Sequence, residues 1–305
     1  MFRKALLIHN HHAGKTGADK RLGDAVAVLA PHIAELVLRP IESPGDGERI
    51  CRSLPSNIEA VFILGGDGTV HECMNGLTSL SHPPSVGILP GGTCNDFSRS
   101  LGIPQDIPEA ARMLLKGTIR SLDIGVVNDR VFTNFCGIGL ITETSENIDP
   151  TLKSSLGKLS YFISTLQTLR SAQPFRFTMV SNGESREEEA VMILVANGRY
   201  LGTHPLPLQP DSLCDGHLDV LIIREAGLPL LKELLARKSE EPWGPKDKAL
   251  EYFRAASLTI ETHEPMKVDT DGEIYLQTPI ELSLLATPLK LLVGAELSDN
   301  CNPSA

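Results

Sequence analysis

Residues 61–77 read VFILGGDGTVHECMNGL, an apolar run that leads through a glycine-rich turn into a segment with helical spacing. The run 60–64 predicts a buried strand and residues 69–80 a helix, so the turn lies where a strand meets a helix. Glycines let the backbone turn sharply, and the N-terminus of the following helix offers N–H groups to a phosphate. Thr69 and Glu72 have the spacing of a capping box, which marks the predicted helix start.

Asp67 places a carboxylate inside this turn, where it would repel a phosphate unless a cation lay between them. We therefore expect a Mg²⁺ ion that bridges Asp67 and a nucleotide. From the glycine content alone, a plain strand-to-helix turn fits equally well. Two common phosphate motifs do not fit, because a Walker A loop would need glycine at His9 and a dinucleotide fingerprint would need glycine at His71.

A second unit of strand, glycine turn and helix follows at residues 87–104, GILPGGTCNDFSRSLGIP. Residues 86–89 predict the strand, and a short helix with Asn95 and Asp96 ends before Gly102 and Pro104. Ligands of open α/β sheets bind outside the carboxyl ends of the strands. Both glycine loops are therefore expected at that edge of one sheet.

The rest of the chain shows two different patterns of predicted secondary structure. Strand-like runs at 4–10 and 36–38 and a helix over 19–30 continue the alternation of strands and helices, which predicts a parallel sheet covered by helices. Further along, β-rich runs separated by turn residues indicate an antiparallel sandwich, at residues 190–196, 218–223, 257–262 and 281–285. We expect one domain over 1–124 and another over 125–288, with 289–305 packed back onto the first.

The composition limits the classes of protein to which this chain of 305 residues belongs. Hydrophobic residues make up 41%, enough for a sizeable core, and the net charge of −10 argues against nucleic-acid binding. No secretory signal and no run of about 18 apolar residues is present, so we expect a cytoplasmic protein with only transient membrane contact. Six cysteines without a Cys-x-x-Cys pair are interpreted as reduced thiols.

The two glycine loops together resemble the motifs of the diacylglycerol kinase catalytic-domain family, which includes bacterial lipid kinases and the sphingosine and ceramide kinases. GGDGT with Glu72 and Asn75-Gly76 resembles the first motif, and LPGGT followed by Asn95-Asp96-Phe97 resembles the second. NAD kinases carry a loop similar to GGDGT, so the pair of motifs is the more specific feature. Segments 195–198, 215–219 and 271–273 resemble further parts of the family in the expected order, whereas Asn10-His11 stands where the family usually has Asn-Pro.

The resemblance implies a Rossmann-like nucleotide-binding α/β domain followed by an antiparallel β-sandwich domain, with ATP in the cleft between them. It also implies roles for the matched residues. Asp67 and Asp96 would organise Mg²⁺ with ATP. The nucleotide would be contacted by Asn10, Gly65, Gly66, Gly68, Thr69, Gly92, Thr93 and Asn95.

Residues 266–275, MKVDTDGEIY, alternate like two strands joined at Asp271-Gly272, and the pattern alone predicts a hairpin turn. The resemblance assigns Asp271 as the catalytic base, which would accept the proton of a lipid hydroxyl as its oxygen attacks the γ-phosphorus. Glu273 would lie close to the same site. Asp269 is a rival carboxylate, since residues two apart in a strand point to the same face.

A second Mg²⁺ site is implied at Asp215, which on pattern alone is a turn residue before a strand. Bacterial relatives that resemble this chain hold a structural Mg²⁺ there through the aspartate side chain and nearby carbonyl groups. By position these carbonyls would belong to Ser212 and His217.

The resemblance implies an ATP- and Mg²⁺-dependent kinase acting on the hydroxyl of a membrane lipid such as diacylglycerol. Two alternatives stay open, a kinase of soluble substrate like the NAD kinases and a non-catalytic lipid- or nucleotide-binding protein. Basic amphipathic segments at 152–176 and 228–243 would either touch the membrane or pack as ordinary helices. The expected partners are ATP and a lipid at the membrane surface, not nucleic acid, and a homodimer stays open.

Overall fold

The chain divides into two units, one formed by Met1–Leu122 with Thr287–Ala305 and the other by Asp123–Ala286. The computed structural model describes residues 2–10, 17–142, 173–206, 208, 213–224, 250–294, 297 and 301. The first unit is an α/β fold around a largely parallel sheet, and the second is an antiparallel β-sandwich. The fold class expected from the sequence is therefore confirmed.

The first unit is built on one six-stranded sheet with the order β2-β1-β3-β4-β20-β5. Neighbouring strands are parallel, apart from the antiparallel pair β20 and β5. Every residue of β3 is buried, as expected where both faces of a sheet are covered. The strands are β1 (Lys4–Asn10), β2 (Glu35–Ile41), β3 (Ala60–Gly65), β4 (Ser85–Pro90), β5 (Thr118–Leu122) and β20 (Leu289–Val293).

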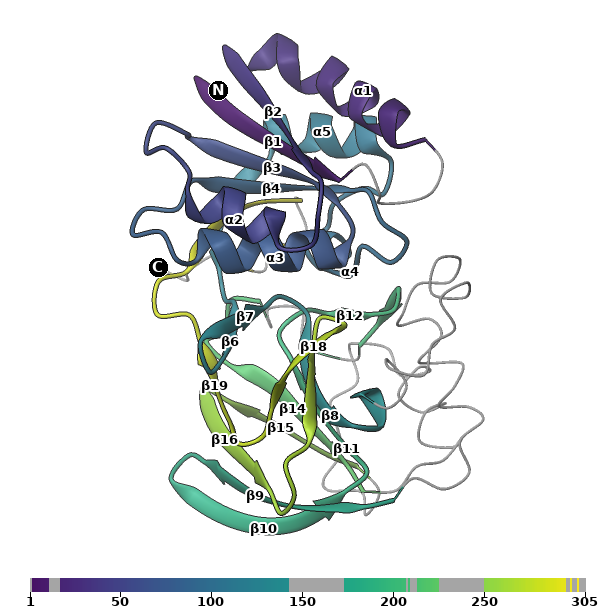
Figure 1. Ribbon diagram of the computed structural model, residues 1–305, viewed down its shortest axis with the longest axis vertical. Coiled ribbons are helices and arrows are strands. Elements are labelled where there is room, and N and C mark those ends of the chain that lie inside the picture. Colours follow the sequence, from purple (N-terminus) through teal and green to yellow (C-terminus); the bar gives the residue numbers. More distant parts are fainter. Residues whose placement is uncertain are drawn as a thin grey trace. The chain divides into compact units, whose positions relative to one another are not determined.

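Helices cover both faces of this sheet (Figure 1). On one face α1 (Ala18–Leu29) packs against α5 (Ile107–Lys116), and on the other α2 (Asp46–Arg52) packs against α3 (Asp67–Leu77). A single 3-10 turn, η1 (Ala30–His32), continues α1, and the short α4 (Asp96–Ser100) follows β4. The two glycine loops thus lie at β3–α3 and β4–α4, as the sequence predicts.

The start of α3 differs from the sequence-based expectation. The helix begins at Asp67, after Gly66 in an extended conformation, and no side chain caps it, so the capping box of Thr69 and Glu72 does not form. The Glu72 carboxylate instead accepts hydrogen bonds from the N–H groups of Gly45 at 2.9 Å and Gly47 at 3.0 Å, at the start of α2. Glu72 was the right residue type for a cap, but it caps a neighbouring helix.

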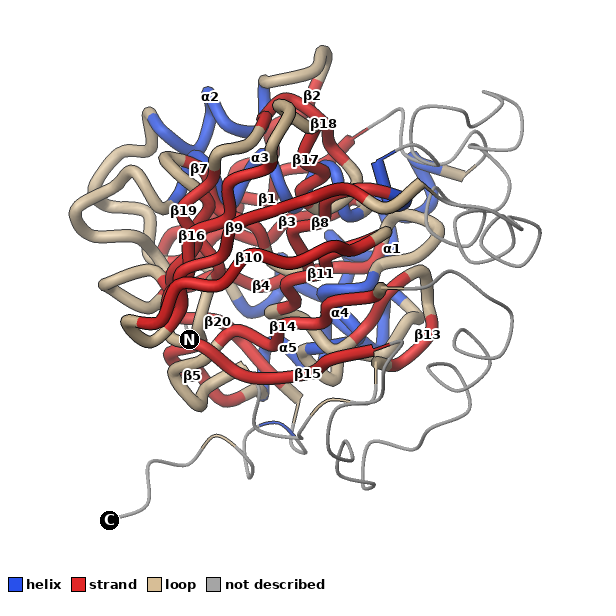
Figure 2. The backbone as a smooth tube through the Cα atoms, turned by 90° about the horizontal axis from the view of Figure 1, so that it is seen from below, coloured by secondary structure: helices blue, strands red, loops and turns tan. Residues whose placement is uncertain are grey.

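The second unit contains two antiparallel six-stranded sheets, ordered β10-β9-β16-β19-β6-β7 and β15-β14-β11-β8-β17-β18, and a small sheet of β12 (Tyr200–Leu201) and β13 (His204–Pro205). Its described part is built largely from strands (Figure 2). The first sheet contains β6 (Gly125–Val127), β7 (Arg130–Phe132), β9 (Phe175–Ser181), β10 (Glu184–Ala190), β16 (Ser257–Thr262) and β19 (Ile280–Leu284). The second contains β8 (Phe135–Gly139), β11 (Met192–Ala196), β14 (Leu218–Ile223), β15 (Leu250–Ala255), β17 (Lys267–Thr270) and β18 (Glu273–Gln277).

Alternating side chains of both sheets form the core of this sandwich, and the hydrophobic effect of burying them holds the sheets together. An ionic network links the edge strands of the two sheets. Arg186 on β10 lies 2.7 Å from Glu251 on β15, and Arg224 lies 2.6 Å from the other oxygen of Glu251 and also pairs with Glu188. Because Glu251 is buried, its two cationic partners help to offset the loss of hydration.

The cysteines depart in part from the expectation of six reduced thiols. Cys51, Cys73, Cys94 and Cys136 are buried free thiols, but Cys214 and Cys301 are disulfide-bonded. The expectation was wrong for these two because disulfide pairing depends on the fold and not on local spacing.

Membrane contact was expected from two amphipathic segments, and most of both lies outside the described residues. This holds for the predicted helices 152–170 and 228–238, whereas Arg176, at the end of the first segment, belongs to strand β9. Among the described helices, none has the length and apolar character needed to cross a bilayer.

Candidate functional site

The two glycine loops of the first unit touch each other because β3 and β4 are neighbours that end at the same level. Gly65 pairs with Pro90 in the strand register, and the Gly91 N–H donates to the Gly65 carbonyl at 2.9 Å. A Cβ atom on Gly92 would lie 2.4 Å from the Cα of Gly66, which is closer than two such atoms can approach. The contact between the loops therefore requires glycine at position 92.

The carboxylate of Asp67 joins the first loop to the helix that follows the second. Its Oδ2 accepts a hydrogen bond from the backbone N–H of Asn95 at 2.9 Å, and its Oδ1 accepts one from Asp96 at 2.8 Å. These N–H groups lie at the start of α4, where a negative charge is favourable. Asp67 therefore fixes the two loops to each other, whether or not it also binds Mg²⁺.

Asn95 closes the second loop from inside. Its backbone has a left-handed conformation with φ of 54°, which asparagine tolerates better than most residues. Its Oδ1 accepts from the Gly92 N–H at 2.8 Å, and its Nδ2 donates to the Gly92 carbonyl at 3.1 Å and to Gln105 at 3.3 Å. The next residue, Asp96, has no exposed surface. Its predicted role as a Mg²⁺ ligand stays a prediction, and its burial does not support that role.

A third segment reaches the same place from the end of β1. The Asn10 side chain donates through Nδ2 to the Thr69 hydroxyl at 3.2 Å, across 59 residues of sequence. The structure thus brings together predicted nucleotide-binding residues from three separate strand ends. The partly or fully exposed members of this set are Asn10, Gly66, Asp67, Gly68, Gly92 and Thr93.

This arrangement suits a bound phosphate group. The loop backbone can approach a ligand closely because glycines line it, and the first N–H groups of the eleven-residue helix α3 begin there. Asp67, at the partly exposed surface, supplies the carboxylate oxygen that Mg²⁺ prefers. The residues present therefore fit a Mg²⁺-bound nucleotide.

In the second unit, Asp271 occupies the turn between β17 and β18 in a left-handed conformation with φ of 54°. One carboxylate oxygen accepts from the Thr133 N–H at 2.7 Å and the Thr133 hydroxyl at 3.1 Å. The other accepts from the N–H groups of Asn134 at 2.8 Å and Phe135 at 3.0 Å. A carboxylate has about four acceptor sites, so these four donors engage the whole group and bind the hairpin to the β7–β8 turn.

Of the two neighbouring acids, Asp269 is buried like Asp271, whereas Glu273 is more exposed. Asp269 has no exposed surface, and its Oδ1 accepts from the Gly272 N–H at 2.7 Å, so this rival carboxylate shapes the turn. Glu273, the first residue of β18, is only partly buried. Of the three carboxylates, Glu273 is the one that a substrate in solution or at a surface can reach most easily.

An aromatic and a basic side chain flank this turn. Tyr275 shares a strand face with Glu273, since the two are two residues apart on β18, and is 45% exposed. The Arg130 guanidinium lies 5.2 Å from the centre of the Tyr275 ring, a cation–π distance. Burial raises the pKa of Tyr275, and the Asp271 charge adds to this, while Thr270 and Arg130 act in the opposite direction.

Asp215, the expected ligand of a structural Mg²⁺, already has two protein partners. Its Oδ1 accepts from the His217 N–H at 2.9 Å, and its Oδ2 lies 2.7 Å from the Arg254 guanidinium. Burial raises the pKa of the nearby Asp123, and the negative charge of Asp215 raises it further. Ser212 lies outside the described residues, so the Mg²⁺ site stays a prediction. In the structure the Arg254 guanidinium already supplies the positive charge next to the Asp215 carboxylate.

The motifs gave no sign of three side chains that complete these sites, Gln105, Arg130 and Arg254. Each belongs to an unremarkable stretch of sequence and is brought in by tertiary structure. Arg254 lies opposite Asp219 in the pairing of β14 with β15. Only a correct prediction of this strand pairing would have pointed to Arg254.

Comparison with known proteins relates both halves of the chain to described families. Residues 4–127 match the family model of the diacylglycerol kinase catalytic domain. Residues 138–293 match the model described as the YegS C-terminal NAD kinase beta sandwich-like domain. The two matches fall largely on the α/β unit and on the sandwich, respectively.

Individual relatives are similar over nearly the whole chain. A protein of Staphylococcus carnosus named "Putative lipid kinase" is 34% identical over 95% of this chain and 97% of its own length. A protein of the same name from Staphylococcus aureus is 31% identical over 97% and 99%. A solved structure, described as a diacylglycerol kinase from Bacillus anthracis, is 37% identical with a TM-score of 0.85 and covers 96% of this chain and 97% of its own.

Proposed function

Because this chain belongs to the diacylglycerol kinase catalytic-domain family, we propose that it transfers the γ-phosphoryl group of ATP to the hydroxyl group of a lipid. The observation that carries the proposal is the joined pair of glycine loops, held in contact by Gly92 and by the hydrogen bonds of Asp67. Such a backbone-lined site suits phosphoryl transfer, in which the protein mainly positions the reactants and neutralises charge.

In this proposal the first unit binds the donor. The loop backbone and the start of α3 hold the phosphates of ATP, and the hydrogen bond between Asn10 and Thr69 keeps the rim of the site in place. Asp67 would hold Mg²⁺, which offsets the negative charge of the phosphates when bound. The hydrogen bonds from Asn95 and Asp96 fix the direction of the Asp67 carboxylate.

The second unit would supply the groups that act on the lipid hydroxyl. The four donors on Asp271 stabilise its carboxylate anion and occupy its acceptor sites, which suits an anchor better than a proton acceptor. We therefore assign proton acceptance to Glu273 and the positioning of the β17–β18 turn to Asp271. This division revises the sequence-based assignment, in which Asp271 was the base.

The acceptor is proposed to be diacylglycerol or a related lipid alcohol at a membrane surface. The name of the sandwich family mentions NAD kinase, so NAD is the competing acceptor that an experiment must include. A protein that binds lipid or nucleotide without catalysis is the other alternative. It would have no need for a carboxylate placed to accept a proton.

The test is the transfer of labelled phosphate from ATP, with Mg²⁺, to a panel of lipids in mixed micelles and to NAD. We expect label in one class of lipid alcohol, and its loss in Gly92→Ala, which separates the two loops. Gly23→Ala is the matched control, since a Cβ atom at this position of α1 meets nothing within 4 Å. Label in NAD alone, or no label while ATP still binds, would contradict the proposal.

A further inference from the structure

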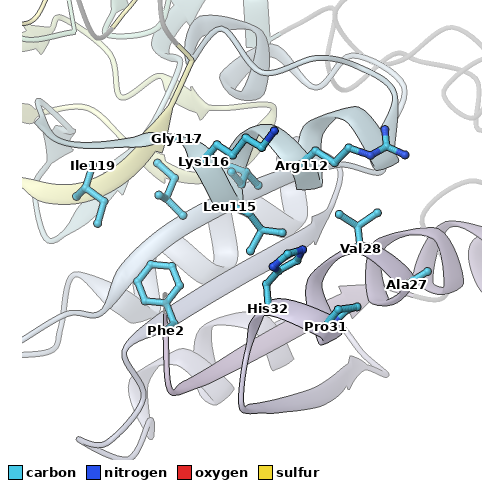
Figure 3. A pocket seen from close by; sticks show the side chains of 12 residues that line it. Phe2, Ala27, Val28, Pro31, His32, Arg112, Leu115, Lys116, Gly117 and Ile119 are labelled. Atoms are coloured by element: carbon cyan, nitrogen blue, oxygen red, sulfur yellow. The ribbon is translucent and has the colours of Figure 1, made fainter.

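The first unit has a hollow that lies between the C-terminal parts of α1 and α5 (Figure 3). Its volume of about 770 Å³ falls within the range of roughly 300–1,000 Å³ that is usual for small-molecule sites. Its walls come from the chain start, from α1 and η1, from α5, and from β5 and β20. Neither glycine loop contributes a residue to it, so this hollow is not part of the proposed donor site.

Apolar side chains line much of the hollow. Phe2 and Ile119 stand on opposite sides of one end, and Leu115 lies further in (Figure 3). The Phe2 ring packs edge-on against Phe62, with 6.3 Å between ring centres, so its position is fixed. Ile119 is 41% exposed, which leaves apolar surface in contact with water. A ligand with an apolar part would cover this surface favourably.

The ionisable side chains in the described lining all belong to basic residue types. His32 lies on one side, and Arg112 and Lys116, one turn apart on α5, lie on the other (Figure 3). Within the described part of the chain no acidic residue lines the hollow, although the chain has a net charge of −10. All three side chains are exposed, and no ion pair within the described ranges involves them. In contrast, Arg49 and Arg52 on α2 each pair with an acidic residue of their own helix.

Helix geometry explains only part of this arrangement. A lysine in the last turn of α5 interacts favourably with the negative end of the helix dipole, which accounts for Lys116. It does not account for Arg112 one turn earlier, for His32 from the opposite wall, or for the exposed side chain of Ile119. Together these features form one apolar hollow with a cationic side, a combination that matches an anionic amphiphile.

We infer that the hollow binds a lipid with a phosphomonoester head group. Arg112 and Lys116 would hold the phosphate, with His32 opposite them, and Phe2, Leu115 and Ile119 would cover the first part of the acyl chain. A phosphomonoester carries close to two negative charges at neutral pH, which suits a cluster of this size. Arginine forms paired hydrogen bonds to phosphate oxygens, which favours a phosphate head over a carboxylate of a single charge.

This inference goes beyond the proposed function, because the site is separate from the residues assigned to phosphoryl transfer. The product of the proposed reaction is itself a phosphomonoester lipid. The hollow would therefore hold a molecule of the product class outside the donor site. Binding can be measured without ATP, so its failure and the failure of the kinase proposal are distinguishable.

The experiment is isothermal titration of the full chain with dioctanoyl phosphatidate below the concentration at which it forms micelles. We expect one molecule per chain in a saturable isotherm, and at least tenfold weaker binding for the pair Arg112→Glu and Lys116→Glu. The matched control is the pair Arg39→Glu and Lys290→Glu, which changes the charge equally at exposed cations of the same unit outside the hollow. It should bind like the wild type.

A second variant tests the apolar part and avoids loss of the fold. Ile119→Gln changes a side chain that is already 41% exposed, and we expect it to weaken dioctanoyl phosphatidate severalfold while leaving thermal unfolding unchanged. Absence of binding, equal weakening in the control pair, or displacement by inorganic phosphate at the same concentration would overturn the inference. Equal affinity for dioctanoylglycerol would overturn it too, since it would show an acceptor site or a merely apolar groove.

Discussion

The two candidate sites are made in different ways. In the α/β unit, the site consists mainly of backbone, with two glycine loops in contact and one aspartate that joins them. In the sandwich, it depends on side chains, and the turn around Asp271 is fixed by donors 136 to 138 residues away in sequence. A backbone site leaves a motif in the sequence, whereas a side-chain site held by distant partners leaves only isolated acidic residues.

The largest expected effect is at the side-chain site. Asp271→Ala would leave three buried N–H groups and the Thr133 hydroxyl without their acceptor. We expect a loss on the order of 3–5 kcal/mol in the free energy of unfolding, measured in urea. Asp129→Ala removes an exposed aspartate of the β6–β7 turn and should change stability by less than about 0.5 kcal/mol. Equal stability of both variants would show that the four contacts do not hold the turn.

The next effect concerns the backbone site. Gly92→Ala places a methyl group 2.4 Å from the Gly66 Cα, so one loop must move, at a cost of roughly 1–3 kcal/mol in stability. ATP affinity, measured by titration calorimetry, should fall at least about tenfold, since about 1.4 kcal/mol corresponds to that factor. Gly23→Ala, in the open face of α1, should stabilise the helix by roughly 0.5–1 kcal/mol and leave ATP binding intact. Unchanged ATP affinity in Gly92→Ala would show that nucleotide binding does not depend on the contact between the two loops.

A smaller effect sharpens the comparison within the α/β unit. Glu72→Gln leaves one acceptor oxygen for the two N–H groups at the start of α2, so we expect a loss of about 1 kcal/mol in thermal or urea unfolding. ATP affinity should stay the same, because the Glu72 contacts lie on α2 and not on the glycine loops. A drop in ATP affinity without a drop in stability would mean that Glu72 serves the ligand directly.

The smallest effect is a pH dependence in the sandwich. Burial raises the pKa of Tyr252, and the charge of Asp219, with which its hydroxyl forms a 2.6 Å hydrogen bond, raises it further. In the unfolded chain Tyr252 has the ordinary tyrosine pKa of 10.0, so it loses its proton at a lower pH than in the folded chain. The stability that the protonated Tyr252 contributes is therefore complete below pH 10.0 and is lost as the pH rises above that value. Urea unfolding at about pH 8 and about pH 10 should show a decrease on the order of 0.4 kcal/mol in the wild type that is absent in Tyr252→Phe. An identical decrease in both would contradict this account.

The contrast between the sites also explains how far the sequence could predict them. The strand–glycine–helix patterns predicted that both loops lie at the carboxyl edge of one sheet, and β-rich runs such as 218–223 and 257–262 coincide with β14 and β16. The contact between Gly66 and Gly92 also requires β3 and β4 to be neighbours that end together, and the sequence pattern did not predict that. The helical cap was misassigned because Glu72 has its donors on another helix, and spacing within one helix gives no sign of that.

The sandwich could be predicted only in outline. The pattern around Asp271 correctly indicated a hairpin, but its four donors come from residues 133–135, which no local pattern links to the hairpin. The hydrogen bonds that lead us to propose Glu273 in place of Asp271 as proton acceptor therefore could not be predicted from the sequence. Arg130 and Arg254 stayed unnoticed for the same reason, since each meets its partner through strand register or tertiary packing.

The most direct test is the single-turnover rate of phosphate transfer from ATP to the accepted lipid by Glu273→Gln. Glu264→Gln, at a side chain that is 86% exposed, is the matched control. If Glu273 accepts the proton, its variant should be slower by about 10²–10⁴, with ATP affinity and stability unchanged, and the control should match the wild type. A rate in Glu273→Gln equal to that of the control would contradict the assignment of Glu273.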